Sequence, residues 1–89
     1  VRKGDRFVVL PAREVEAIEA ESNYMWLYRG GEAYSLRATL AALEEGLDPA
    51  RFLRTHRSWM LNLQHVRELL SGPKGGLLAV TAGGLKVPV

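Results

Sequence analysis

The 89-residue chain contains no cysteine, and it has no apolar run long enough to cross a membrane. The absence of cysteine excludes disulfide bonds, thiolate nucleophiles and the common cysteine-containing zinc sites. The charged start at residues 1–5 is not followed by the apolar core of a signal peptide, so no secretion signal is expected. We therefore expect a cytoplasmic protein without membrane contact, folded as one domain over residues 1–89. Because the initiator Met is missing, we expect it to be a piece of a longer protein.

Acidic residues are almost absent from the second half of the chain. Residues 1–50 carry six Lys and Arg against nine Asp and Glu, a formal charge of −3. Residues 51–89 carry six Lys and Arg against Glu68 alone, a formal charge of +5. This asymmetry predicts a site for a polyanion in the second half. The alternative is that the basic half is only a solvated face.

Turn residues divide the chain into many short segments. The residues between the turns favour strands, which we expect at residues 5–10, 14–20, 24–28, 32–36, 52–55, 58–61, 66–70, 77–81 and 85–88. The segment 14–20 alternates polar and apolar residues, so its acidic side chains are expected on a solvent-exposed face. Many short strands with regular turns predict an all-β fold, either a sandwich of short antiparallel strands or a barrel.

One short helix is predicted between the strands. Thr39 is a suitable N-cap, and Gly46 is expected to stop the helix at its other end. The helix is amphipathic, with an apolar stripe made of Leu40, Leu43 and Leu47. A helix this short is stable only when it packs on the sheet.

The segment 52–62 carries the most informative polar residues. Its strand break places three hydrogen-bond donors together, His56, Arg57 and Ser58, and no acidic residue lies between Asp48 and Glu68. A guanidinium matches guanine or a phosphate, whereas hydroxyl and imidazole groups suit phosphates or base edges. Of the arginines flanking the break, Arg54 is expected to contact phosphate. The alternative is that Ser58 and Asn62 only satisfy backbone groups at strand ends.

Two further polar positions are candidates for binding. Asn23, in the turn 22–24, either pairs with adenine or stabilises the turn. Arg37 either contacts phosphate or pairs with one of the acids of its half. Trp26 and Trp59 are expected in or near the core, because no basic and aromatic residues interleave around them as they do in single-strand stacking platforms.

Catalysis has little support in the sequence. Two His and scattered acids give no metal-ligand spacing. A triad of Asp48, His56 and Ser58 is unfavourable because a His two residues from the Ser rarely has the required geometry. We therefore expect a protein that is not an enzyme and that needs no cofactor or metal.

Four segments in order resemble the LytTR family of DNA-binding domains. Residues 18–24 (IEAESNY) are similar to the I-E-A-x-x-N-Y signature, and residues 36–44 (LRATLAALE) to the R-x-T-L-x-x-L-E helix entry. Residues 52–62 (FLRTHRSWMLN) resemble the F-x-R-x-H-R-S-x-x-V-N motif, the most specific of the four. Residues 85–89 (LKVPV) look like the L-P-V stretch near the end of the family pattern.

The resemblance implies a β-sandwich with one small helix, in which loops between strands enter successive major grooves of DNA. It implies sequence-specific binding of double-stranded DNA by the output domain of a bacterial response regulator. The implied partners are paired direct repeats in DNA, a receiver or other sensory domain in the full-length protein, and a second copy, as a dimer on DNA. The alternative function is a β-rich protein–protein interaction domain with a basic face, which binds an acidic partner or its own receiver.

The resemblance also implies which residues contact DNA. Arg57 is expected to read a base and Arg37 to lie near the backbone. The full candidate set is Asn23, Tyr24, Arg37, Arg54, His56, Arg57, Ser58 and Lys86. The family normally continues past Pro-Val with a Ser-Arg pair that supplies a third contact, but this chain stops at Val89. We expect a lower affinity if that contact is missing.

Overall fold

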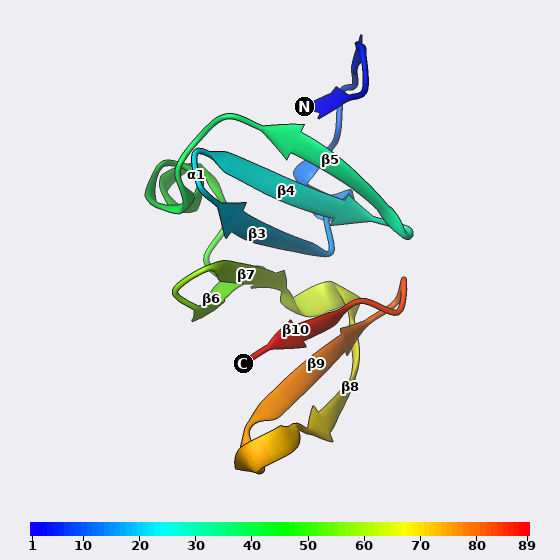
Figure 1. Ribbon diagram of the computed structural model, residues 1–89, viewed down its shortest axis with the longest axis vertical. Coiled ribbons are helices and arrows are strands. Elements are labelled where there is room, and N and C mark those ends of the chain that lie inside the picture. Colours follow the sequence, from blue (N-terminus) through cyan, green and yellow to red (C-terminus); the bar gives the residue numbers. More distant parts are fainter.

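The computed structural model describes the backbone of residues 1–89 and every side chain except that of Pro73. Antiparallel strands dominate the molecule and form two sheets (Figure 1). The larger sheet has seven strands in the order β2-β1-β5-β4-β3-β7-β6. Its strands are β1 (Arg2–Lys3), β2 (Arg6–Phe7), β3 (Ala17–Glu21), β4 (Tyr24–Arg29), β5 (Glu32–Leu36), β6 (Phe52–His56) and β7 (Trp59–Asn62).

The smaller sheet contains three strands in the order β10-β9-β8. These are β8 (Val66–Ser71), β9 (Leu77–Thr81) and β10 (Lys86–Pro88). Short 3-10 turns precede β3 (η1, Ala12–Glu14), join β7 to β8 (η2, Leu63–His65) and join β8 to β9 (η3, Pro73–Gly75). The two sheets meet through buried apolar side chains, Ala17 and Leu61 from the larger and Ala79 and Val87 from the smaller. The predicted all-β class with one short helix is therefore confirmed.

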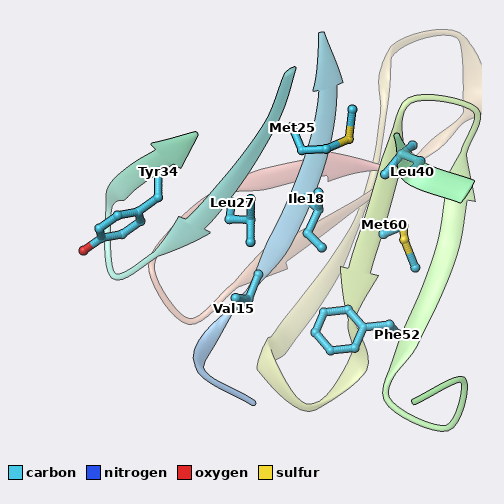
Figure 2. Packing of buried hydrophobic residues seen from close by; sticks show 8 residues of the cluster. All are labelled: Val15, Ile18, Met25, Leu27, Tyr34, Leu40, Phe52 and Met60. Atoms are coloured by element: carbon cyan, nitrogen blue, oxygen red, sulfur yellow. The ribbon is translucent and has the colours of Figure 1, made fainter. Parts of the chain in front are cut away.

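A second apolar cluster lies on the other face of the seven-stranded sheet, under the helix α1 (Leu40–Gly46). Residues alternate across the sheet, so Ile18 points into this cluster while its neighbour Ala17 points toward the smaller sheet. Figure 2 shows Leu40 of the helix beside Met25 and Met60 of the strands. Burial of this apolar face holds a helix that would be too short to form alone.

The predicted signals for the start and the end of the helix are both confirmed. The Thr39 hydroxyl accepts a hydrogen bond from the Ala42 N–H at 3.1 Å, as an N-cap does. The helix ends at Gly46, as predicted, and the chain becomes extended at Leu47. The helix ends because Leu47 turns back to pack on the core.

Two predicted strands near the N-terminus are wrong in part. The segment 5–10 forms only β2, because the chain turns at Gly4 (φ +62°) and pairs β1 with β2. Residues 8–10 lie outside the strands, and the Val9 side chain is 93% exposed. In the segment 14–20, Glu14 is the last residue of the 3-10 turn, and strand β3 begins only at Ala17.

Glu16 was expected to face solvent, but its side chain is buried, with 4% of its surface exposed. Its carboxylate accepts hydrogen bonds from the backbone N–H of Gly30 at 2.6 Å and of Gly83 at 2.8 Å. Gly30 belongs to the β4–β5 turn and Gly83 to the turn between β9 and β10. Glu16 therefore ties the larger sheet to the smaller one.

Asn62 satisfies backbone groups at a strand end, the role that the sequence analysis gave as an alternative for Ser58 and Asn62. Its fully buried side-chain amide donates to the Val15 carbonyl at 2.9 Å and accepts from the Gln64 N–H at 3.0 Å. It thereby satisfies backbone groups where β7 ends and the chain crosses to the smaller sheet.

Candidate nucleic-acid interface

Two hairpin turns lie at the same end of the molecule as the helix. They are the β3–β4 turn at residues 22–23 and the β6–β7 turn at residues 57–58 (Figure 1). A groove with a volume of about 550 Å³ runs between them and α1. Four of the predicted site residues line it together, namely Asn23, Arg37, Arg54 and Arg57. The structure thus brings together four residues that lie up to 34 positions apart in the sequence.

The β3–β4 turn is tight and presents its polar residues to solvent. Glu21 pairs with Tyr24, which leaves Ser22 and Asn23 as the two turn residues. Ser22 has a positive φ of 55°, a conformation that costs a non-glycine residue free energy. Asn23 is exposed, and the Tyr24 ring is 47% exposed. The turn therefore projects an amide and a phenol from the end of a rigid sheet.

The β6–β7 turn follows an irregularity in strand pairing. Arg54 pairs with Met60 and His56 with Trp59, so the register shifts by one residue at Thr55. Arg54 shares the face of its partner Met60, on the helix side of the sheet, whereas the shift places His56 on the face of Trp59. The Trp59 ring stacks on Tyr28 with centroids 5.9 Å apart, so the base of the hairpin is well packed.

Hydrogen bonds fix the residues of this turn. The Ser58 N–H donates to Nδ1 of His56 at 3.2 Å, and the Ser58 carbonyl accepts from the Ala20 N–H at 2.7 Å. Because Nδ1 accepts, the neutral His56 ring carries its proton on Nε2 and can donate it outward. The exposed Arg57 guanidinium makes no ion pair with any described residue.

Arg54 is engaged within the protein, which the sequence did not indicate. Its Nη2 donates to the Arg57 carbonyl at 2.7 Å, and its Nη1 lies 3.8 Å from Oε1 of Glu44 on the helix. The segment 49–67 contains no acid in the sequence, but the fold brings an acid of the N-terminal half to it. Glu44 is thus a residue of the site that sequence reasoning missed.

The other four predicted residues lie beside the groove or away from it. Tyr24 and Arg37 share a smaller hollow of about 310 Å³ next to the groove. His56 and Ser58 belong to the same hairpin turn as Arg57 but do not line the groove. Lys86 begins β10 of the smaller sheet, next to the β9–β10 turn, which lies at the other side of the molecule (Figure 1). The structure does not bring Lys86 to the other seven residues.

A second groove of about 680 Å³ lies at the opposite end, around Glu16. Two of its three arginines are paired with acids: Nη1 of Arg29 is 2.9 Å from Oε1 of Glu14, and Arg51 is 3.9 Å from Asp48, while Arg13 makes no ion pair with a described residue. Although larger, this groove is a weaker candidate for a polyanion, since most of its positive charge is neutralised inside the protein. The groove between the two turns has three arginines and only one acid paired with them.

The described residues contain no group of three or more His, Asp or Glu that could hold a metal ion. Among the helices that the structure describes, none is long and apolar enough to span a membrane.

The family model described as "LytTr DNA-binding domain" matches residues 5–89, almost the whole chain. Fold comparison gives a similar result. The LytTr DNA-binding domain of a Bacillus cereus response regulator superimposes with a TM-score of 0.88 over 99% of this chain and 81% of that chain. At 23% identity this likeness concerns the fold.

Curated relatives are regulatory proteins. The CO-responsive transcriptional regulator RcoM of Rhodospirillum rubrum is 38% identical over 73 residues, 81% of this chain and 31% of that protein. The sensory transduction protein LytT of Enterococcus faecalis is 26% identical over 85 residues, 96% of this chain and 35% of that protein. The transcriptional regulatory protein YpdB of Escherichia coli K12 is 30% identical over 67 residues, 75% of this chain and 28% of that protein. The chain thus spans about a third of the length of the curated relatives it matches.

Proposed function

This chain belongs to the LytTR family of DNA-binding domains, and on that premise we propose that it binds specific sites in double-stranded DNA through its two hairpin turns. The β6–β7 turn and the β3–β4 turn would each enter a major groove. The observation that carries the proposal is the groove that unites Asn23, Arg37 and two further arginines at one end of the sheet.

Hairpin turns have the right size for this task. The major groove of B-DNA is about 12 Å wide and admits a two-stranded ribbon, whose strands lie about 5 Å apart. The turns are fixed by packing and backbone hydrogen bonds, so their backbones are ordered before DNA binds. That preorganisation lowers the entropic cost of binding.

The site residues divide into base readers and backbone contacts. Arg57 is the proposed base reader, because its exposed guanidinium can bond guanine O6 and N7 with two parallel N–H groups. Asn23 offers the amide that pairs with adenine in the same groove. Arg37, Tyr24, the His56 Nε2–H and the Ser58 hydroxyl are proposed to donate to phosphates on either side.

Lys86 and Arg54 need separate treatment. Lys86 lies in the other sheet, so we propose that it contacts a phosphate only where the duplex extends beyond the two turns. Arg54 lines the groove, but its guanidinium already has protein partners. If Arg54 also contacts a phosphate, it does so while it keeps its bonds to the Arg57 carbonyl and to Glu44.

The chain spans about a third of the curated relatives it matches, so we propose that it is the output domain of a longer cytoplasmic regulator. A receiver or another sensory domain would supply the signal. Two copies would occupy paired direct repeats and form a dimer on DNA.

Selection from a random duplex library tests the proposal. The retained fraction should converge on a short motif, and binding to that motif should weaken steeply with salt, since log K falls by about 0.9 per phosphate contact for each unit of log salt. Recovery of random sequence with no salt dependence would refute it. That outcome would favour the alternative, a protein–protein interaction domain with a basic face.

A further inference from the structure

We propose that Glu44 and Arg54 are positioning residues, which hold the β6–β7 turn in the orientation that presents Arg57 to a base. The inference rests on the proposed function, and it gives Arg54 a different main role from the phosphate contact expected from the sequence. Glu44 acts through Arg54 and touches no DNA.

The geometry of the Arg54 guanidinium supports this role. One of its terminal nitrogens, Nη2, donates to the carbonyl of Arg57 across the turn at 2.7 Å. The other, Nη1, lies 3.8 Å from the Glu44 carboxylate on the helix. A single planar group thus connects the turn to α1, and its two ends have different partners.

The helix provides a fixed point for this connection. Leu40 is buried and Leu43 and Leu47 pack on the same apolar cluster, while Thr39 caps the first turn. Glu44 follows Leu43 directly, so packing of the helix determines where its carboxylate lies. Both charged side chains remain partly exposed, 37% for Arg54 and 48% for Glu44, so keeping them charged requires little desolvation.

The turn has few other bonds that could set the direction of Arg57. The Ser58 N–H and carbonyl are used by His56 and Ala20. The Arg57 carbonyl is held by Arg54, and no other hydrogen bond to it is found among the described residues. Because this carbonyl belongs to the peptide unit that follows the Arg57 Cα, fixing it restricts the backbone rotation that aims the Arg57 side chain.

A positioning role and a phosphate contact predict different binding behaviour. Loss of a phosphate contact weakens binding to all sequences and reduces the salt slope by about one. Loss of positioning leaves the salt slope unchanged and lowers the ratio of specific to non-specific affinity. Glu44 distinguishes the positioning role from the phosphate contact further. Without a positioning role, an acid near the duplex would only repel it, so its removal would not lower specific binding.

The experiment compares Glu44→Ala with Glu45→Ala, the next residue of the same helix. Glu45 is exposed and makes no ion pair with a described residue, so both variants remove one negative charge and gain the same helix propensity. Affinities are measured by fluorescence anisotropy for the selected duplex and for a scrambled one, at two salt concentrations. Thermal unfolding confirms that each variant folds.

We expect Glu45→Ala to raise both affinities slightly and to leave their ratio unchanged. Glu44→Ala should lower the ratio about threefold, the effect of losing one exposed ion pair. Arg54→Ala should lower the ratio about tenfold without changing the salt slope, because it also loses a charge-assisted hydrogen bond. Arg54→Lys should resemble Arg54→Ala, because an ammonium does not have the two-nitrogen fork that spans both partners.

Two results would overturn the inference while leaving the proposed function intact. One is a Glu44→Ala variant with the same ratio as Glu45→Ala. The other is an Arg54→Ala variant that loses affinity for both duplexes equally and has a smaller salt slope. A wild-type protein that prefers no duplex would instead refute the proposed function itself, and the inference with it.

Discussion

Replacing Glu16 by Gln is expected to destabilise the domain strongly, although the two side chains have nearly the same shape. The Glu16 carboxylate is buried and accepts two backbone N–H groups, Gly30 on Oε2 and Gly83 on Oε1. Gln offers one carbonyl oxygen and one NH₂ group, so one backbone donor would face another donor. The substitution therefore breaks one of the two hydrogen bonds through which Glu16 joins the β4–β5 turn of the larger sheet to the β9–β10 turn of the smaller one.

The magnitude follows from the unpaired backbone donor. A buried donor without a partner costs about 1–3 kcal/mol, and the cost is toward the upper end when the lost acceptor was charged. A loss of about 2–3 kcal/mol corresponds to a fall of roughly 10–20 °C in the unfolding midpoint of a domain this size. The control, Glu45→Gln on the exposed helix face, should change stability by less than about 0.5 kcal/mol.

The pH dependence of stability gives a second signature of Glu16. Burial of the carboxylate raises its pKa, but hydrogen bonds from Thr81, Gly30 and Gly83 and the nearby His65 outweigh it, so the pKa lies below its ordinary value of 4.5. A lowered pKa stabilises the fold above the unfolded value, and this stabilisation is lost as pH falls through the folded pKa. The difference in unfolding free energy between wild type and Glu16→Gln should therefore shrink below about pH 4.5.

Circular dichroism during thermal and urea unfolding, from pH 7 down to pH 3, measures both effects. A Glu16→Gln variant as stable as Glu45→Gln at pH 7 would refute the role assigned to the carboxylate. So would a stability difference that grows at low pH.

Three further substitutions test the local structure by urea unfolding. Gly83→Ala should cost about 1–3 kcal/mol of stability, because an added Cβ would lie 2.8 Å from both carboxylate oxygens of Glu16. Its control, Gly46→Ala, has open space around it and should be neutral or stabilising by up to about 1 kcal/mol. Equal effects of the two substitutions would contradict the close packing of Gly83 on Glu16. Asn62→Ala should cost about 2–3 kcal/mol, because it leaves buried backbone groups unpaired, and a neutral result would mean that water replaces the amide. Thr39→Ala should cost about 1 kcal/mol through loss of the helix cap, and an unchanged midpoint would show that packing alone holds the helix.

The sequence predicted those parts of the fold that local chemistry determines. Gly30 and Gly31 supply the positive φ angles of the β4–β5 turn, and β5 has the predicted bounds. Thr39 marks the start of the helix for a similar reason, because its hydroxyl bonds the N–H three residues later. The length of the N-terminal strand, by contrast, depends on tertiary contacts that have no local signal. A strand is predicted over residues 5–10, but the observed strand ends at Phe7.

The site was predictable in part for the same reason. Asn23 and Arg57 lie in turns whose polar character is visible in the sequence, and the groove unites them. The pairing of Glu44 with Arg54 has no local signal, since the two residues are ten positions apart and meet only when the helix packs on the sheet. The separation of Lys86 from the other candidates also depends on sheet topology, which no motif reveals.

The most direct test of the account compares Arg57→Ala with Arg67→Ala in titrations of the selected and scrambled duplexes. Both residues are exposed arginines, but only Arg57 lines the groove. We expect Arg57→Ala to weaken binding to the selected duplex by about 1–3 kcal/mol and to relax the preference at one base position, while Arg67→Ala keeps the preference. Equal losses for the two variants, or an unchanged preference in Arg57→Ala, would contradict it.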